Sequence, residues 1–110
     1  MNINIKATNT TLTDGMRNTV NDKISALEHL TREEDKIHVE IDVNTTHNSG
    51  DNFRVEVSIQ PHGEFAEATA GDMYEALDLV IPKIREQLVK QKDKKISLRR
   101  RLGNLFKRSV

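Results

Sequence analysis

The sequence has no cysteine, no net charge and no long apolar run. Without cysteine there is no disulfide framework, no thiolate zinc site and no thiol nucleophile. No stretch approaches the roughly 18 apolar residues that cross a bilayer, and the first ten residues, MNINIKATNT, lack the apolar centre of a signal peptide. We therefore expect a soluble, cytoplasmic protein of 110 residues with one modest core.

Charge is balanced over the whole chain but not along it. Residues 83–110 hold 11 of the 17 lysines and arginines and only two acidic residues, Glu86 and Asp93. Residues 1–82 hold six basic and 15 acidic side chains. The C-terminal quarter thus has a surplus of nine positive charges, and the rest has a surplus of nine negative charges. A polyanion such as a phosphate backbone would be attracted to the first and repelled by the second.

Alternation of apolar and polar residues predicts four β-strands. Residues 2–8, 37–44 and 53–60 alternate clearly, and the last two, separated by the turn-forming HNSGDN, predict an antiparallel pair with one buried face. Residues 65–70 follow the turn PHGE. The alanines of this last stretch are expected to face inward, where small side chains let a helix approach closely: Ala66, Ala68 and Ala70.

Two stretches have the spacing of amphipathic helices. The first runs for about 18 residues after the predicted cap Thr13. The second follows the predicted cap Asp72, and its apolar stripe extends from Met73 to Leu88. Pro82 lies nearly opposite this stripe on a helical wheel, so we expect it to bend the helix around the sheet rather than break it. The order β-α-β-β-β-α predicts an α+β fold with a four-stranded sheet and two helices packed on one face, similar to double-stranded-RNA-binding domains.

The predicted sheet and helices carry charges of opposite sign. Acidic side chains dominate the open sheet face: Glu40, Asp42, Glu56 and Glu67, against Lys6 and Arg54. Basic side chains flank the apolar stripe of the last helix: Lys83, Lys90 and Lys94 on one side, Arg85 and Lys92 on the other. In the first helix, Lys23 would reach the groove between the helices, with Arg17 beside it. Any one of these is most simply a solvated residue that suits the helix dipole, but that does not explain eleven basic residues against two acidic ones.

Three stretches resemble the ribosome hibernation promoting factors, also called ribosome-associated translation inhibitors or protein Y: MNINIKATNTTLTDGMRNTV, GEFAEATAGDMYEALDLV and the lysines leading into KQKDKK. The resemblance covers residues 1 to about 95. It implies a protein that occupies the decoding channel of the small ribosomal subunit, competes with messenger and transfer RNA, and keeps idle ribosomes inactive under stress or in stationary phase. It also implies six ribosomal-RNA contacts: Arg17, Lys23, Lys83, Lys90, Lys92 and Lys94. Glu86 departs from the basic residue of relatives, and Arg85 beside it is a further candidate.

Residues 96–110, ISLRRRLGNLFKRSV, extend beyond the resemblance. We expect them to form a basic, flexible tail after a ribosome-binding domain of residues 1–95, because Gly103 and Asn104 weaken any helix there. Four more basic residues at this end join the candidate RNA-binding set: Lys95, Arg99, Arg100 and Arg101. A tail of about 15 residues cannot be the dimerisation domain of the family's long members, so we expect a short form that is a monomer when free.

The sequence offers no convincing catalytic or metal site. The four histidines share no ligand spacing, and the set His38, Glu40 and Asp42 on one strand face is better explained as solvated surface. There is no glycine-rich phosphate loop and no nucleophile elbow. We therefore expect no enzymatic activity, no metal and no cofactor.

Two functions stay open. The first is an RNA-binding translation inhibitor that acts by occupancy, with the small subunit and its ribosomal RNA as partner and no membrane partner. The second is a protein-interaction module whose basic tail docks on an anionic membrane or an acidic partner. We favour the first because the basic helix leads directly into the tail.

Overall fold

The computed structural model describes the backbone of residues 1–44 and 52–108 and the side chains of residues 1–44 and 52–92. The elements follow one another as β1 (Asn2–Thr8), α1 (Asp14–Ser25), the 3₁₀ helix η1 (Glu28–Leu30), β2 (Lys36–Val43), β3 (Phe53–Gln60), β4 (Glu64–Ala70) and α2 (Met73–Arg108). Of the predicted turn HNSGDN, all but the last residue lies outside the described residues.

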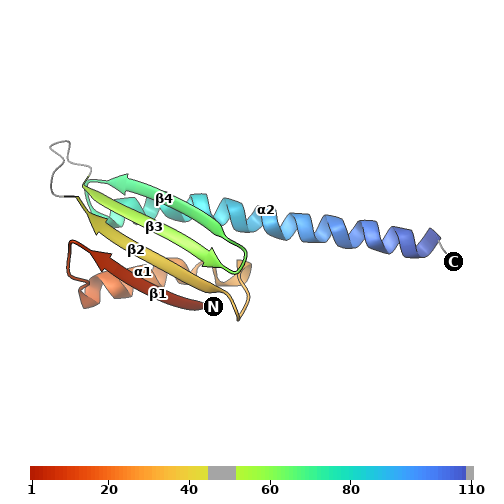
Figure 1. Ribbon diagram of the computed structural model, residues 1–110, viewed down its shortest axis with the longest axis horizontal. Coiled ribbons are helices and arrows are strands. Elements are labelled where there is room, and N and C mark those ends of the chain that lie inside the picture. The colour runs from red at the N-terminus through yellow and green to blue at the C-terminus, as the bar shows by residue number, and fades with distance from the viewer. Residues whose placement is uncertain (45–51, 109–110) are drawn as a thin grey trace.

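The four strands form one mixed sheet in the order β1-β2-β3-β4. β1 pairs with β2 in parallel, while β2 with β3 and β3 with β4 are antiparallel. The parallel pair requires a crossover connection, which α1 supplies. Both helices lie side by side on one face of the sheet, and the other face is open (Figure 1). The predicted α+β fold is confirmed, including the antiparallel pairing of β2 with β3.

The core lies between the sheet and the two helices. Alternate residues of β2, β3 and β4 are buried, as their alternation predicts. All three alanines of β4 face inward, and α2 packs over them. The predicted stripe of α2 is buried throughout: Met73, Leu77, Val80, Ile84 and Leu88. Burying each large side chain of such a stripe contributes about 1.5–3 kcal/mol, which fixes α2 on the sheet.

Both predicted helix caps are present. The Oγ1 atom of Thr13 accepts a hydrogen bond from the Met16 N–H at 3.1 Å. The Oδ1 atom of Asp72 accepts one from the Glu75 N–H at 2.8 Å. Each bond satisfies one of the N–H groups that the first turn of a helix leaves without a partner.

The first helix is shorter than the predicted 18 residues. α1 ends at Ser25, after 12 residues, and the chain tightens into η1. Hydrogen bonds to the residue three positions earlier replace the helical ones, from Leu27 N–H to Ile24 O and from Leu30 N–H to Leu27 O, both at 2.9 Å. The apolar spacing continues through this change and Leu27 is buried, which explains why the pattern alone suggested one longer helix.

α2 is a continuous helix of 36 residues that extends beyond the sheet (Figure 1). Pro82 is exposed within it and does not break it, as predicted, while the bend expected at this position stays a prediction. The predicted domain boundary at residue 95 lies inside α2, whose backbone continues through Gly103; flexibility of this end stays a prediction. Within the described ranges, no helix combines the length and apolar character needed to cross a membrane.

The alanines of β4 set how closely α2 can approach the sheet. We expect Ala68→Leu to lower the free energy of unfolding by about 1–3 kcal/mol, because the added carbons have no room against α2. Thr69→Leu puts the same side chain on the open face of the same strand, and it should change the free energy of unfolding by about 0.5 kcal/mol or less. Urea unfolding followed by circular dichroism gives both values; equal effects at the two positions would contradict this packing.

Candidate nucleic-acid interface

The described basic side chains of α2 occupy two flanks of the helix, as predicted. Lys83 and Lys90 line a shallow groove that follows the edge of β4. Lys92 lines a separate cavity next to η1. Arg85, seven residues before Lys92, lies on nearly the same side of the helix, since seven residues are close to two turns. The buried stripe of α2 therefore separates the two flanks.

Two α2 side chains on the first flank also cover the free edge of β4. The Gln87 amide accepts a hydrogen bond from the Phe65 N–H at 2.9 Å and donates one to the Phe65 carbonyl at 2.5 Å. The Lys83 Nζ donates to the Glu67 carbonyl at 3.1 Å. These bonds give partners to backbone groups that an edge strand would otherwise offer to another chain. Lys83 keeps two further N–H donors for an external anion.

Lys23 links the two helices. Its Nζ forms a salt bridge with Asp78 Oδ1, and the two side chains are 35% and 62% exposed. This places Lys23 in the groove between α1 and α2, as predicted. Arg17 is exposed and precedes Lys23 by six residues, so the two side chains project about 120° apart around α1. They therefore do not converge on one groove.

Lys90 has an acidic neighbour on its own helix. Its Nζ lies 3.1 Å from Glu86 Oε1, one turn earlier, and the two side chains are 71% and 68% exposed. Such a pair in contact with water contributes only a few tenths of a kcal/mol to stability. It nevertheless cancels one positive charge on this flank, at the position where the resemblance implies a basic residue.

Three of the predicted contacts make no ion pair with any described residue: Arg17, Arg85 and Lys92. All three are exposed. The other five predicted contacts belong to the part of α2 for which only the backbone is described: Lys94, Lys95, Arg99, Arg100 and Arg101. The structure thus places six of the eleven candidates, split between α1 and the two flanks of α2.

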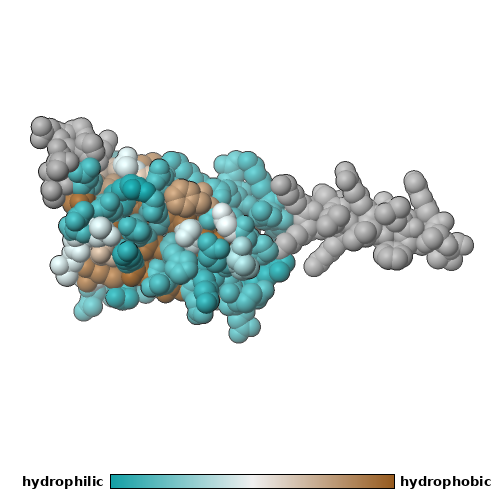
Figure 2. Space-filling view, viewed as in Figure 1, coloured by the Kyte–Doolittle hydropathy of each residue, from teal (hydrophilic) through white to brown (hydrophobic). Residues whose placement is uncertain are grey.

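The open face of the sheet is acidic, as predicted. Glu40, Glu56 and Glu67 stand side by side on β2, β3 and β4, and Lys6 continues the row on β1. Arg54 bridges Glu56 and Glu67, with a distance of 3.0 Å to Glu67. Figure 2 shows a mainly hydrophilic surface on this side of the molecule. Neighbouring glutamates of like charge make this face a poor surface for a phosphate backbone.

Sequence reasoning missed two buried carboxylates, Asp35 and Glu64, which are 3% and 5% exposed. Both line the cavity that contains Lys92. The alternation of apolar and polar residues could have predicted that these two carboxylates face inward. Asp35 comes immediately before β2 and two residues before the buried Ile37, and Glu64 begins β4 two residues before the buried Ala66, so both share the inward side of the alternation. Within the described ranges, no group of three or more histidines, cysteines and acids is placed to hold a metal ion.

Comparison with known proteins gives a family and a fold. The family model described as sigma 54 modulation protein / S30EA ribosomal protein matches residues 3–96. The N-terminal domain of protein Y from Thermus thermophilus has a TM-score of 0.66 at 23% identity, covering 80% of this chain and 96% of that one. A ribosomal subunit interface protein from Coxiella burnetii has a TM-score of 0.66 at 23% identity, covering 84% and 99%. At this identity the two structures establish a shared fold.

The Gln87 amide makes two of the hydrogen bonds that join α2 to the edge of β4. We expect Gln87→Ala to lower the free energy of unfolding by about 1–2 kcal/mol, because two hydrogen bonds to Phe65 are lost. Glu86→Ala, at the neighbouring exposed position, should cost less than about 0.5 kcal/mol. Urea unfolding measures both, and a Gln87 variant no less stable than the Glu86 variant would rule out this role.

Proposed function

The chain belongs to the sigma 54 modulation protein / S30EA ribosomal protein family, and we propose that it binds the small ribosomal subunit and inhibits translation there. The matched residues, 3–96, include the sheet, α1 and the packed part of α2. The two structural neighbours are named as a protein Y domain and a ribosomal subunit interface protein, which supports a ribosomal partner and a cytoplasmic site of action.

The observation that carries this proposal is the concentration of positive charge in α2 from Lys83 onward, on the face opposite the acidic open side of the sheet. The open sheet face presents a row of three glutamates, whereas basic side chains lie along both flanks of α2. A polyanion is therefore attracted to α2 from Lys83 onward and repelled from the open face of the sheet. Ribosomal RNA is such a polyanion, and phosphate contacts by lysine and arginine would orient the protein on it.

Mechanistically, we propose inhibition by occupancy. The protein would fill the decoding channel with its helical side against the RNA and so exclude messenger and transfer RNA, keeping idle ribosomes inactive under stress or in stationary phase. No chemical step is required. Lys23 and Lys90 can contribute despite their acidic partners, because exposed salt bridges contribute little and can be exchanged for phosphate contacts at low cost.

The C-terminal part of α2 extends the same charge pattern. Residues 93–108 continue the helix beyond the sheet and contain seven lysines and arginines against Asp93. We propose that this segment adds phosphate contacts to those of the folded domain, including contacts by Lys94, Lys95, Arg99, Arg100 and Arg101. Its distance from the acidic sheet face favours such contacts, since little negative potential opposes them there.

Competition tests the proposed mode of inhibition. The protein should sediment with purified small subunits, and saturating messenger RNA with initiator transfer RNA should displace it, because the ligands would share one channel. Full simultaneous occupancy by transfer RNA and this protein would contradict inhibition by occupancy. Binding to anionic vesicles in place of subunits would support the interaction-module alternative.

Reversing the charges of α2 should abolish inhibition without unfolding the protein. We expect Lys83→Glu/Lys90→Glu/Lys92→Glu to eliminate inhibition in a cell-free translation assay. Losing three phosphate contacts should also reduce the slope of log affinity against log salt concentration by about two to three.

The matched control is Lys6→Glu/Lys36→Glu, which reverses exposed lysines on strands β1 and β2. For each charge reversed, this control should weaken subunit binding far less than the triple variant of α2 does. Circular dichroism and urea unfolding verify that both variants fold. Undiminished inhibition by the triple variant would show that the flanks of α2 do not face the RNA.

A further inference from the structure

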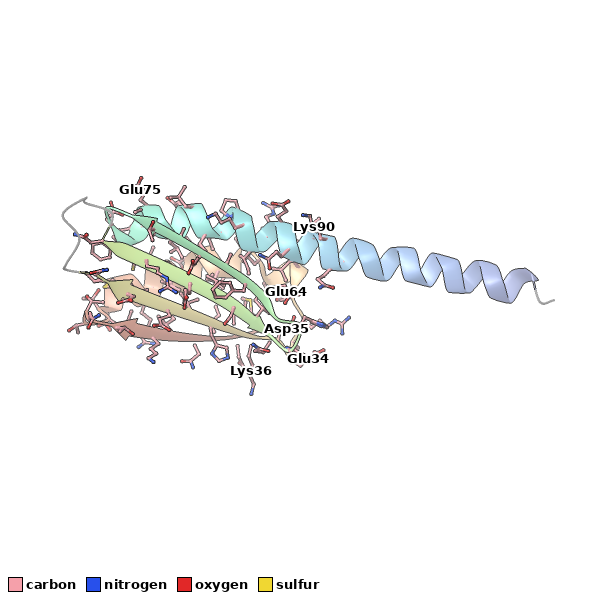
Figure 3. All side chains as sticks on the ribbon, turned by 45° about the horizontal axis from the view of Figure 1, so that its top comes forward. Glu34, Asp35, Lys36, Glu64, Glu75 and Lys90 are labelled. Carbon is pink, nitrogen blue, oxygen red and sulfur yellow. The ribbon has the colours of Figure 1, made fainter. Side chains whose placement is uncertain are left out.

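A cavity at one end of the sheet combines buried acceptors with a basic rim. It has a volume of about 370 Å³, within the range of small-molecule sites. Three segments form it: the link between η1 and β2, the turn between β3 and β4, and α2 at Leu88, Gln91 and Lys92. Figure 3 shows Asp35 and Glu64 together at this end of the sheet.

Each of the two carboxylates has one buried oxygen without a hydrogen-bond partner among the described residues. The Oδ2 atom of Asp35 accepts a bond from the Arg32 N–H at 2.8 Å, but its Oδ1 accepts none. The Oε2 atom of Glu64 likewise accepts none. A buried acceptor without a donor is costly, and more so when it carries charge. The inner end of the cavity therefore favours a ligand that offers N–H donors.

The rim argues against a simple cation as that ligand. Arg32 and Lys92 also line the cavity, so its formal charges cancel. An ammonium or metal ion would meet both positive side chains on its way to the carboxylates. A neutral donor group attached to an anion fits better, because the donors can reach the carboxylates while the anion stays at Lys92 and Arg32.

We propose that this cavity binds the base of an unpaired guanine nucleotide. The Watson–Crick edge of guanine carries two adjacent donors, N1–H and the N2 amino group, which match the unpaired oxygens of Asp35 and Glu64. Its phosphate can reach Lys92 or Arg32, and His29 and His62, which also line the cavity, can stack on the ring. Guanine also carries the O6 acceptor on this edge, but adenine, cytosine and uracil have no two adjacent donor groups there, so one of their acceptors would face a carboxylate.

This inference builds on the proposed function, in which the guanine would belong to ribosomal RNA. Lys92 connects the proposed function with the cavity, because it is both a predicted phosphate contact and part of the cavity rim. A single-stranded base inserted here would add sequence preference to binding that phosphate contacts alone leave unspecific. A free guanine nucleotide carries the same chemistry and could fill the same cavity.

Titration of the free protein with mononucleotides tests the site itself. Guanosine monophosphate should shift the NMR amide signals of Asp35 and Glu64 at lower concentration than inosine monophosphate, which lacks the N2 amino group. Uridine monophosphate should have the weakest effect. Equal responses to the guanine and uracil nucleotides would overturn the proposal, since phosphate attraction alone would then explain them.

Glu64→Gln tests the carboxylate and keeps the shape of the side chain. We expect it to weaken binding of guanosine monophosphate roughly ten- to a hundredfold, the usual effect of losing a buried hydrogen bond to a charged group. Glu75→Gln makes the same charge change at an exposed site in the first turn of α2, far from the cavity (Figure 3), and should leave binding unchanged. Unaltered affinity of a Glu64 variant that urea unfolding shows to be folded would refute the site.

Binding to purified small subunits identifies the source of the guanine. A tenfold or larger loss for Glu64→Gln, with none for Glu75→Gln, would assign the site to ribosomal RNA. The site would instead be assigned to a free nucleotide if the protein bound guanosine monophosphate selectively but Glu64→Gln and Glu75→Gln bound subunits equally well. Failure of the unaltered protein to bind subunits would refute the proposed function while a guanine-selective response still upheld the cavity site.

Discussion

The packing of α2 on β4 is the contact on which the rest of this molecule depends. One apolar stripe, from Met73 to Leu88, is buried against a strand whose inward side chains are alanines. Because the stripe occupies one side of the helix, every other side chain of α2 has its direction set relative to the sheet. The described basic side chains of α2, those of Lys83, Arg85, Lys90 and Lys92, are thereby placed on two flanks, and the helix axis is directed past the end of the sheet. Burial of apolar surface thus determines where the charge lies.

Positive charge in this fold is concentrated in α2 from Lys83 onward rather than spread over the whole chain. The sheet face bears the row of glutamates, and Arg54 is shared between two of them. On the helical side, Lys23 and Lys90 have acidic partners, but these pairs are exposed and weak. Their lysines can exchange partners at little cost. A protein with no net charge can therefore still present one attractive side to a polyanion.

The cavity beside η1 differs from this surface because its acids are buried. Asp35 is held by the turn that it closes, through the Arg32 N–H. Glu64 occupies the first inward position of β4, where the following inward residues are alanines. An apolar residue at position 64 would fill this inward position without leaving a buried acceptor unpaired, and an unpaired buried carboxylate lowers stability. A polar site retained at such a cost is typical of function.

The sequence by itself determined the elements, the buried faces and the unequal distribution of charge. Alternation and helical spacing are local patterns, so the strands, both caps and the stripe of α2 could be predicted from them. Tertiary structure decided the rest. The first helix ends early, where its last turn tightens into η1 and Leu27 is still buried. Lys83 and Gln87 bind a strand edge, and Asp35 and Glu64 share one cavity, although 29 positions separate these acids in sequence. These contacts join residues that are distant in sequence, and they depend on how the segments pack, which local sequence patterns do not predict.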